Sequence, residues 1–377
     1  MPDGGMREMD GKRAPRNGLI DLARLGFAGV VMMYHFYSNG KKHFPGGFLG
    51  VEFFAILAGF LMYSAWDRHQ VAELPLDGRQ QYWLGYMKKR YIRFFWYCLV
   101  AFIAAFFVLR IWRDGVRGIA GISDALSVDI WEILQIKMLG LNRGGGLLNS
   151  PAWTMGCMLF AEFFILGMLT VFKRQFIVFA MPLSVIFGIG YWMNVENTSI
   201  WKFHTFFTFG MLRIYILTCI GIFSYLLCKK LKEIPFSHTG RWALTVAELM
   251  GYAGCVLIIL HRNSIYDDFC FILFATLALA QSFSGKSFAG NMFPANTFTS
   301  FCAELSLSLY LTHRPVSRIF QDILFKSDNV TDLYRQKFIF LYCALAIALA
   351  YTYIMRGVFK MLPIVKKKLK SIMLEQS

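Results

Sequence analysis

Three ionisable side chains lie inside the first long apolar segment of this chain, residues 18–37: Asp21, Arg24 and His35. An ionisable side chain at membrane depth is costly, so it rarely persists there without a partner or a function. Eleven residues at 100° each amount to three turns plus about 20°, so Arg24 and His35 share one helix face, about 16 Å apart along the axis. The spacing predicts a site that runs through the membrane, with a cation near one surface and a titratable imidazole near the other.

Asp21 and Arg24 are three residues apart and can form an ion pair on the helix surface. A juxtamembrane ion pair with an interfacial histidine is the alternative to a functional site. That alternative explains Asp21, but it does not explain why Arg24 lies about two turns inside the segment.

Two further groups of polar residues lie at the ends of neighbouring apolar segments. Glu52 lies near the start of the second segment, which runs back toward the first, so we expect its carboxylate at a depth close to that of His35. A carboxylate beside an imidazole orients the ring and raises its basicity, as a base that activates a hydroxyl requires. Arg90 and Arg93 share a helix face and can bind a phosphorylated ligand bidentately. The alternative for Glu52 is a glutamate that faces water near a helix end. The alternative for Arg90 and Arg93 is a basic flank that only sets the orientation of the span.

Two motifs occur later in the chain. The motif from Asn149 to Trp153, Asn-Ser-Pro-Ala-Trp, opens another apolar segment, and Glu162 lies about half-way through that segment. We expect Glu162 to make an interhelical hydrogen bond, and Trp153 to border a pocket or the membrane interface. Near the C-terminus, Tyr310 and His313 belong to Ser-Leu-Ser-Leu-Tyr-Leu-Thr-His-Arg-Pro, where a mid-span histidine and arginine should face the bundle interior or a cavity.

The composition indicates which elements position these residues. With 56% hydrophobic and only 16% charged residues, the chain is typical of an integral membrane protein and not of soluble domains. Segments of about 20 apolar residues can each span a bilayer as a helix. This rule predicts an all-α polytopic bundle of about ten transmembrane helices. The ten segments are 18–37, 46–66, 91–112, 152–172, 176–193, 203–228, 242–260, 267–283, 300–322 and 334–362.

Lysine and arginine are concentrated in alternate connections, which predicts that both termini are cytoplasmic. We therefore expect a cytoplasmic N-terminal tail (1–17), one membrane domain (18–362) and a basic cytoplasmic C-terminal tail (363–377). The first segment is too long and too polar at its start to be a cleaved signal, so we expect it to be retained. The 113–150 connection is predicted to be extracytoplasmic, with a surface amphipathic helix near Ile130–Leu141.

The charge and the cysteines exclude two other classes of function. The net charge of +16 comes from residues at the ends of apolar segments, and no nucleic-acid-binding motif is present. The eight cysteines show no metal-type spacing, so we expect buried reduced thiols, no metal and no permanently bound cofactor.

Taken together, the motifs resemble those of the integral membrane acyltransferase 3 family of bacteria, which modifies surface polysaccharides. The resemblance rests on Arg24 and His35 (R-x10-H), the Gly-Val-Glu-Phe-Phe sequence around Glu52, Arg90-x-x-Arg93, Asn149-x-Pro-x-Trp153, and Tyr310-Leu-Thr-His313. The Asn-x-Pro-x-Trp motif is similar to that of capsule and exopolysaccharide modifiers. Many family members carry a glutamate in the fourth span where this chain has Met158, which leaves open which carboxylate supports the histidine.

The resemblance implies transfer of an acyl group, usually acetyl, from cytoplasmic acyl-CoA to a hydroxyl of a surface glycan or its lipid-linked precursor, in the bacterial inner membrane. His35 would be the base, with Glu52 orienting its ring and Arg24 as a further residue of the catalytic site. Arg90 and Arg93 would bind the CoA phosphates, and Arg24 could supply another cation there. Direct transfer and a ping-pong route are both compatible with the sequence. A glycan or lipid transporter or flippase and a polysaccharide polymerase are the alternatives; the R-x10-H spacing favours the acyltransferase over the transporter.

Overall fold

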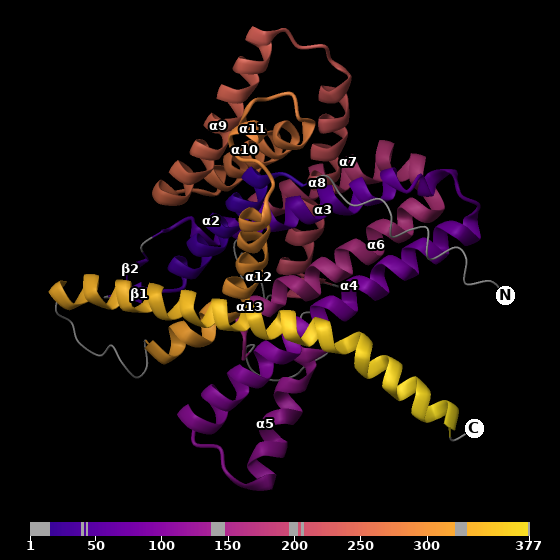
Figure 1. Cartoon of the computed structure of the whole chain (residues 1–377). Helices are drawn as coiled ribbons and strands as arrows, with labels where there is room; N and C mark the ends of the chain where they lie inside the picture. Colours follow the sequence, from indigo (N-terminus) through magenta and orange to yellow (C-terminus); the bar gives the residue numbers. More distant parts are fainter. Residues whose placement is uncertain are drawn as a thin grey trace.

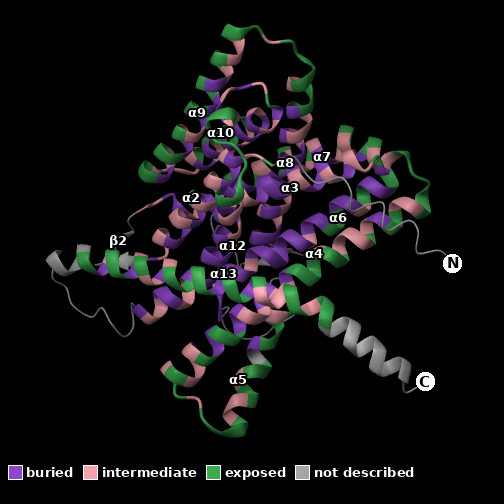
Figure 2. Cartoon of the chain, viewed as in Figure 1, coloured by how far each residue is buried: buried purple, intermediate pink, exposed green. Residues whose placement is uncertain are grey.

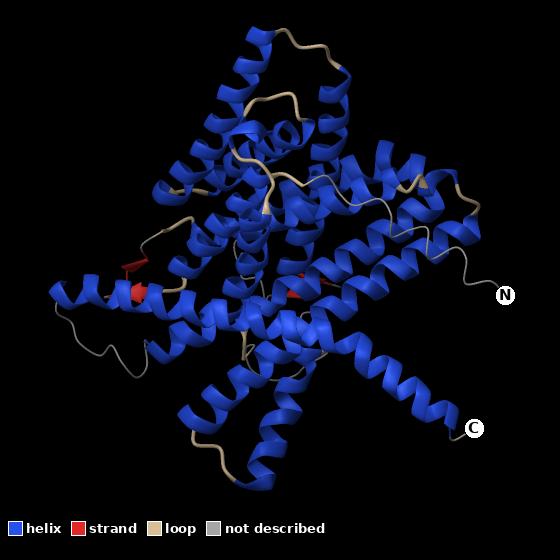
Figure 3. Ribbon diagram, viewed as in Figure 1, coloured by secondary structure: helices blue, strands red, loops and turns tan. Residues whose placement is uncertain are grey.

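A computed structural model of the chain shows an almost entirely helical protein (Figure 1, Figure 3). The structure describes residues 16–38, 41–42, 44–136, 148–195, 203–204, 207–320 and 330–375. Within these ranges the only strands form two short antiparallel pairs, β1 (Tyr37–Ser38) with β2 (Lys41–Lys42) and β3 (Phe203–His204) with β4 (Phe207–Thr208). The prediction of an all-α polytopic fold is confirmed.

The helices are named in chain order. The α-helices are α2 (Gly18–Tyr34), α3 (Gly50–Arg68), α4 (Leu76–Ala105), α5 (Gly118–Ile133), α6 (Trp153–Gln175), α7 (Met181–Asn194), α8 (Phe209–Glu233), α9 (His238–His261), α10 (Ile265–Ser284), α11 (Ala289–Met292), α12 (Thr297–Ile319) and α13 (Val330–Glu375). The 3₁₀ helices are η2 (Gly47–Leu49), η3 (Val71–Glu73) and η6 (Ser150–Ala152), and the π-helices are η4 (Phe106–Arg113) and η7 (Phe176–Ala180).

Seven helical runs of the described residues are long and apolar enough to cross a membrane. They are Gly47–Arg68, Leu76–Arg113, Ser150–Asn194, Phe209–Glu233, His238–His261, Ile265–Ser284 and Arg335–Ile364. All ten predicted segments overlap helices, but a count of ten spans is not confirmed. Helix α2 has only 17 residues, and the fourth and fifth segments form one continuous run that bends at Phe172, whose φ of −128° and ψ of 45° are not helical. The sixth predicted segment also begins too early, because helix α8 starts at Phe209.

The centre of the bundle is the crossing of α3 and α8. A Cβ atom on Gly59 of α3 would overlap the carbonyl of Thr218, and one on Gly221 of α8 would overlap the carbonyl of Ile56. Small residues at such a crossing let two backbones approach closely, which is a common way for helices to associate in membranes. Most side chains of α3 are buried, whereas α9 and α13 expose side chains along much of their length (Figure 2).

Helix α12 lies between α2 and α13 and contacts both (Figure 1). Buried apolar side chains from the three helices, among them Met32, Leu309 and Phe340, form one hydrophobic cluster that holds them together. The residues that line the candidate site come mainly from α2, α3, α4, α6 and α12, so this half of the bundle positions them.

Helices η4 and α5 form an arm that projects from the bundle (Figure 1). Arg110 of η4 donates to both carboxylate oxygens of Asp129 of α5, at 2.9 and 3.3 Å, and this pair joins the two helices. At the tip, the Arg113 guanidinium hydrogen-bonds to Asp114 and lowers the pKa of that carboxyl. An amphipathic helix was predicted near Ile130–Leu141. The helix instead ends at Ile133, and residues 137–147 lie outside the described part of the chain.

Candidate functional site

A cavity of about 210 Å³ opens among helices α2, α3, α4, α6 and α12. Four residues predicted from the sequence line it: Arg24, Arg90, Arg93 and Tyr310. The remaining lining is mostly apolar, with two further hydroxyls. It consists of Val51, Phe54, Leu57, Ala58, Leu61, Phe94, Thr154, Met155, Met158, Ser306 and Leu307. The structure therefore brings residues that are nearly 300 positions apart in sequence into one largely apolar chamber with three cations.

The three arginines of the cavity differ in their partners. Arg90 donates from Nε and Nη2 to the two carboxylate oxygens of Glu162, both at 2.6 Å, and Glu162 is fully buried. This pair confirms the interhelical hydrogen bond predicted for Glu162. Because a buried carboxylate needs a counter-charge, the charge of Arg90 is largely balanced.

Arg24 has a weaker partner than Arg90. Its Nη1 lies 3.9 Å from Asp21, which also accepts a 2.9 Å hydrogen bond from Arg16. The Nε of Arg24 is buried and has no hydrogen-bond partner among the described residues. The predicted Asp21–Arg24 pair is thus present, and Arg24 keeps a donor available at the wall of the cavity.

A pair of hydroxyls lies at the cavity wall. The hydroxyls of Thr154 and Tyr310 are 2.9 Å apart, and Thr154 also contacts the carbonyl of Pro151 at 3.0 Å. A carbonyl can only accept, so the single hydrogen of Thr154 goes to Pro151 and Tyr310 donates to Thr154. Met158, which stands where many family members carry glutamate, adds an apolar surface to the same wall.

Two histidine rings stack beside Tyr310. The rings of His35 and His313 lie 5.3 Å apart at an interplanar angle of 25°, and the ring of His313 lies 5.9 Å from that of Tyr310. His35 ends α2, and its carbonyl accepts a 2.9 Å hydrogen bond from Ser317 of α12. Tyr310, His313 and His35 therefore form a row that leads from the cavity to the end of α2.

The tautomer of His313 follows from its contacts. Its Nδ1 lies 2.8 Å from the carbonyl oxygen of Tyr310 and 3.2 Å from that of Leu309. Since carbonyl oxygens only accept, Nδ1 carries the hydrogen and Nε2 presents a lone pair. The ring is fully buried, and within the described chain Nε2 has no hydrogen-bond partner. His313 is thus a neutral acceptor placed against His35.

Glu52 has a different partner from the one expected. Its carboxylate, which is fully buried, forms an ion pair with Arg213 of α8. The guanidinium of Arg213 also lies 4.8 Å from the centre of the Trp192 ring. The role of Glu52 in orienting His35 therefore stays a prediction. We did not single out Arg213 from the sequence, although a charge inside an apolar segment is itself a signal.

Trp153 begins α6 and packs against the central hydrophobic core, and it does not line the cavity. Among the described residues no group of three His, Cys, Asp or Glu side chains is arranged to hold a metal ion.

Residues 17–356 match the sequence model of the acyltransferase 3 family, which is described as an acyltransferase domain. The chain belongs to the acyltransferase 3 family. The match includes every residue that lines the cavity and both stacked histidines. With its several apolar helices, this acyltransferase is a multi-pass membrane protein. Comparison with curated proteins and with solved structures finds no significant match.

Proposed function

We propose that this acyltransferase moves an acetyl group from acetyl-CoA to a hydroxyl of a cell-surface polysaccharide or of its lipid-linked precursor. The observation that supports this proposal best is the cavity, which has arginines on its wall and leads through Tyr310 to the His313–His35 pair. We place the protein in the bacterial inner membrane with both termini in the cytoplasm, because its basic connections alternate with less basic ones.

The donor half of the proposal rests on the cations of the cavity. CoA carries several phosphates, and guanidinium groups bind phosphate bidentately. Glu162 balances the charge of Arg90, so Arg24 and Arg93 supply most of the attraction for the phosphates. We propose that Arg90 is held by Glu162 as part of the wall that shapes the phosphate site.

The size of the cavity favours a short acyl group. A protein cavity of about 150 Å³ can hold a benzene molecule, so a cavity of about 210 Å³ holds on the order of ten non-hydrogen atoms. An acetyl group with a few neighbouring atoms is within this size and a whole CoA molecule is not, so only part of the donor occupies the cavity.

The proposed chemistry places His35 as the general base. Its ring accepts the proton of the sugar hydroxyl while the hydroxyl oxygen attacks the thioester carbonyl. The carbon–sulfur bond then breaks, the CoA thiolate leaves, and the proton passes from His35 to that thiolate, which regenerates the neutral base. General-base help of this kind is typically worth about 10²–10⁴-fold in rate. His313, whose Nδ1 bonds to carbonyl oxygens of its own helix, stacks on His35 and restricts the orientation of that ring. A ping-pong route, in which a protein group first carries the acetyl, agrees equally well with this arrangement.

The proposal is tested with the variant His35→Ala in cells whose surface glycan is analysed by mass spectrometry. We expect the mass increment of each acetyl group to disappear, while the amount of protein in the membrane fraction is unchanged. His261→Ala is the matched control, because that exposed histidine ends α9, far in sequence from the site, and does not line the cavity. Normal glycan acetylation by the His35 variant would exclude His35 as the base.

A further inference from the structure

Pro315 lies inside helix α12 and leaves one carbonyl of that helix without its usual partner. Proline has no N–H, so the carbonyl four residues earlier, that of Leu311, cannot form its helical hydrogen bond. The side chain of Asn149 supplies the missing donor, with Nδ2 2.8 Å from the oxygen of Leu311. Both residues are buried, so no water competes at this contact. Two separate sequence motifs are thus joined by one hydrogen bond.

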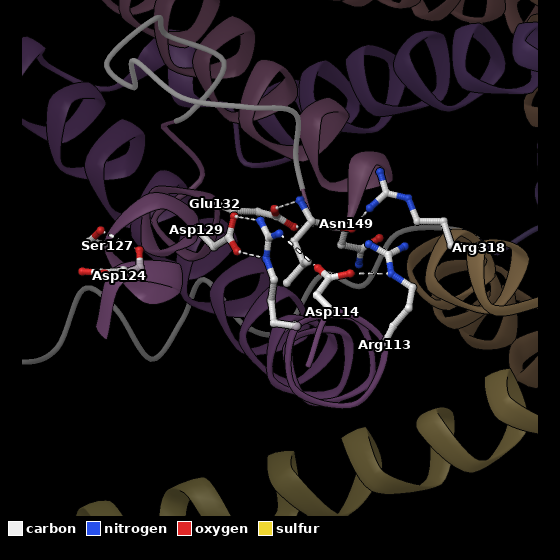
Figure 4. Close-up of polar contacts among 10 residues, drawn as sticks. Arg113, Asp114, Asp124, Ser127, Asp129, Glu132, Asn149 and Arg318 are labelled. Atoms are coloured by element: carbon white, nitrogen blue, oxygen red, sulfur yellow. Dashed lines mark hydrogen bonds and ion pairs between the residues drawn. The ribbon is translucent and has the colours of Figure 1, made fainter. Parts of the chain in front are cut away.

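Asn149 is itself fixed by Glu132 of the projecting arm (Figure 4). The carboxylate of Glu132, which is buried, accepts from the backbone N–H of Leu148 at 2.8 Å and from that of Asn149 at 2.9 Å. From the other side, Arg318 of α12 donates to the carbonyl of Leu148 at 3.0 Å. The peptide Leu148–Asn149 is therefore held between α5 and α12, and we call this set of contacts the 132–149–311 clamp.

The clamp acts on the turn of α12 that carries the proposed chemistry. Leu311 lies between Tyr310, which lines the cavity, and His313, which stacks on His35. The Nδ1 of His313 bonds to carbonyl oxygens in the same turn, so a shift of this turn changes both the direction of the ring and its contact with His35.

We propose that Glu132 and Asn149 are positioning residues of the acyltransferase. Through the 132–149–311 clamp they hold the Tyr310–His313 turn of α12 in register with His35. The proposal rests on the proposed function for its effect on catalysis, whereas the clamp itself can be measured without any activity. The clamp thereby makes the arm a determinant of the turnover rate, although none of the arm's described residues lines the cavity.

The first experiment measures the clamp alone, by thermal unfolding of the full-length protein purified in detergent. The variants are Asn149→Ala, Pro315→Ala and the double variant. Pro315→Ala restores an N–H to α12, so Leu311 regains its helical partner and no longer needs the amide of Asn149. We expect Asn149→Ala to lower the Tm clearly in the wild-type background and much less in the Pro315→Ala background. An equal fall in both backgrounds would overturn the clamp.

The second experiment measures the effect on turnover with acetyl-CoA as the donor. Glu132→Gln keeps the shape, but its amide accepts only at one oxygen and turns an N–H₂ group toward a backbone N–H. Because a misplacement of about 1 Å at a catalytic group can slow a reaction by about 100-fold, we expect kcat to fall by about 10- to 100-fold. KM for acetyl-CoA should stay within about twofold, since Glu132 does not line the cavity.

Asp124→Asn is the matched control for Glu132→Gln, because Asp124 is an exposed carboxylate on the same helix. We expect its kinetics to equal those of the wild type. A raised KM with normal kcat in Glu132→Gln, or kinetics like those of the control, would overturn the positioning role. If the wild type itself does not turn over acetyl-CoA, the proposed function fails, and the Tm measurements still decide whether the clamp exists.

Discussion

The ion pair between Arg90 and Glu162 should contribute strongly to stability, and the variant Glu162→Gln tests it. The carboxylate is fully buried and Arg90 is 25% exposed, so water screens the pair only slightly. Two hydrogen bonds to charged groups contribute about 1.5–3 kcal/mol each, which gives a range of about 3–6 kcal/mol. Removal of one partner of a buried pair typically costs about 3–5 kcal/mol. The two ranges overlap, so we expect Glu162→Gln to lower the free energy of unfolding by about 3–5 kcal/mol.

A fall of this size is measurable by thermal unfolding in detergent. At about 2 °C per kcal/mol, the lower end for large domains, it corresponds to a decrease in Tm of about 6–10 °C. The double variant Arg90→Met, Glu162→Met replaces the whole pair by apolar side chains, which is often close to neutral, and should recover most of the loss. Glu233→Gln is the control, because the pair of Glu233 with Lys230 is exposed and contributes less than about 1 kcal/mol. A Tm of Glu162→Gln equal to that of the control, or a double variant less stable than the single one, would refute this reasoning.

Two further predictions concern the cavity and the central crossing. Arg93→Ala should raise KM for acetyl-CoA by about tenfold or more, because a charged hydrogen bond contributes about 1.5–3 kcal/mol, and Arg93→Lys should recover only part of it. An unchanged KM in steady-state kinetics would remove Arg93 from the donor site. Gly59→Ala should lower the Tm by the equivalent of about 1–3 kcal/mol or prevent folding, because the added methyl group overlaps the backbone of α8. Gly26→Ala, with open space around its Cβ, is the control and should not lower the Tm, because alanine favours a helix more than glycine does.

The elements could be predicted from the sequence wherever an apolar segment is long and uninterrupted. The prediction was weaker where a span is short, as in α2, or where two spans run together, as in Ser150–Asn194. Hydropathy depends only on the composition of a window, so it places a helix but does not show whether the chain bends or leaves the bilayer between two windows. This is why all ten segments overlap helices and yet a count of ten spans is not confirmed.

Four residues that line the cavity could be predicted from the sequence, but partners on distant helices could not. An ionisable residue in an apolar segment must have a partner, and this rule correctly indicated the partnered state of Glu162 and the closeness of Asp21 to Arg24. It does not identify a partner on a distant helix. For Glu52, depth along the segment suggested His35, whereas the rotation of α3 directs the carboxylate to Arg213. Rotation about the helix axis depends on packing against several neighbours at once, and one segment alone does not determine it.

The proline of α12 also bears on the order in which the helices of the bundle assemble. Asn149 is synthesised 162 residues before Leu311, so its side-chain amide cannot bond to the Leu311 carbonyl until α12 has been inserted. Until then α12 has a carbonyl without a donor, which is costly in lipid, and this cost drives the helix toward its place beside the 148–149 peptide. The turn with Tyr310 and His313 is therefore completed only after most of the chain has been synthesised. A nascent or truncated chain that ends before α12 therefore contains Arg24, His35, Arg90 and Arg93 but lacks the turn that places Tyr310 and His313 beside them.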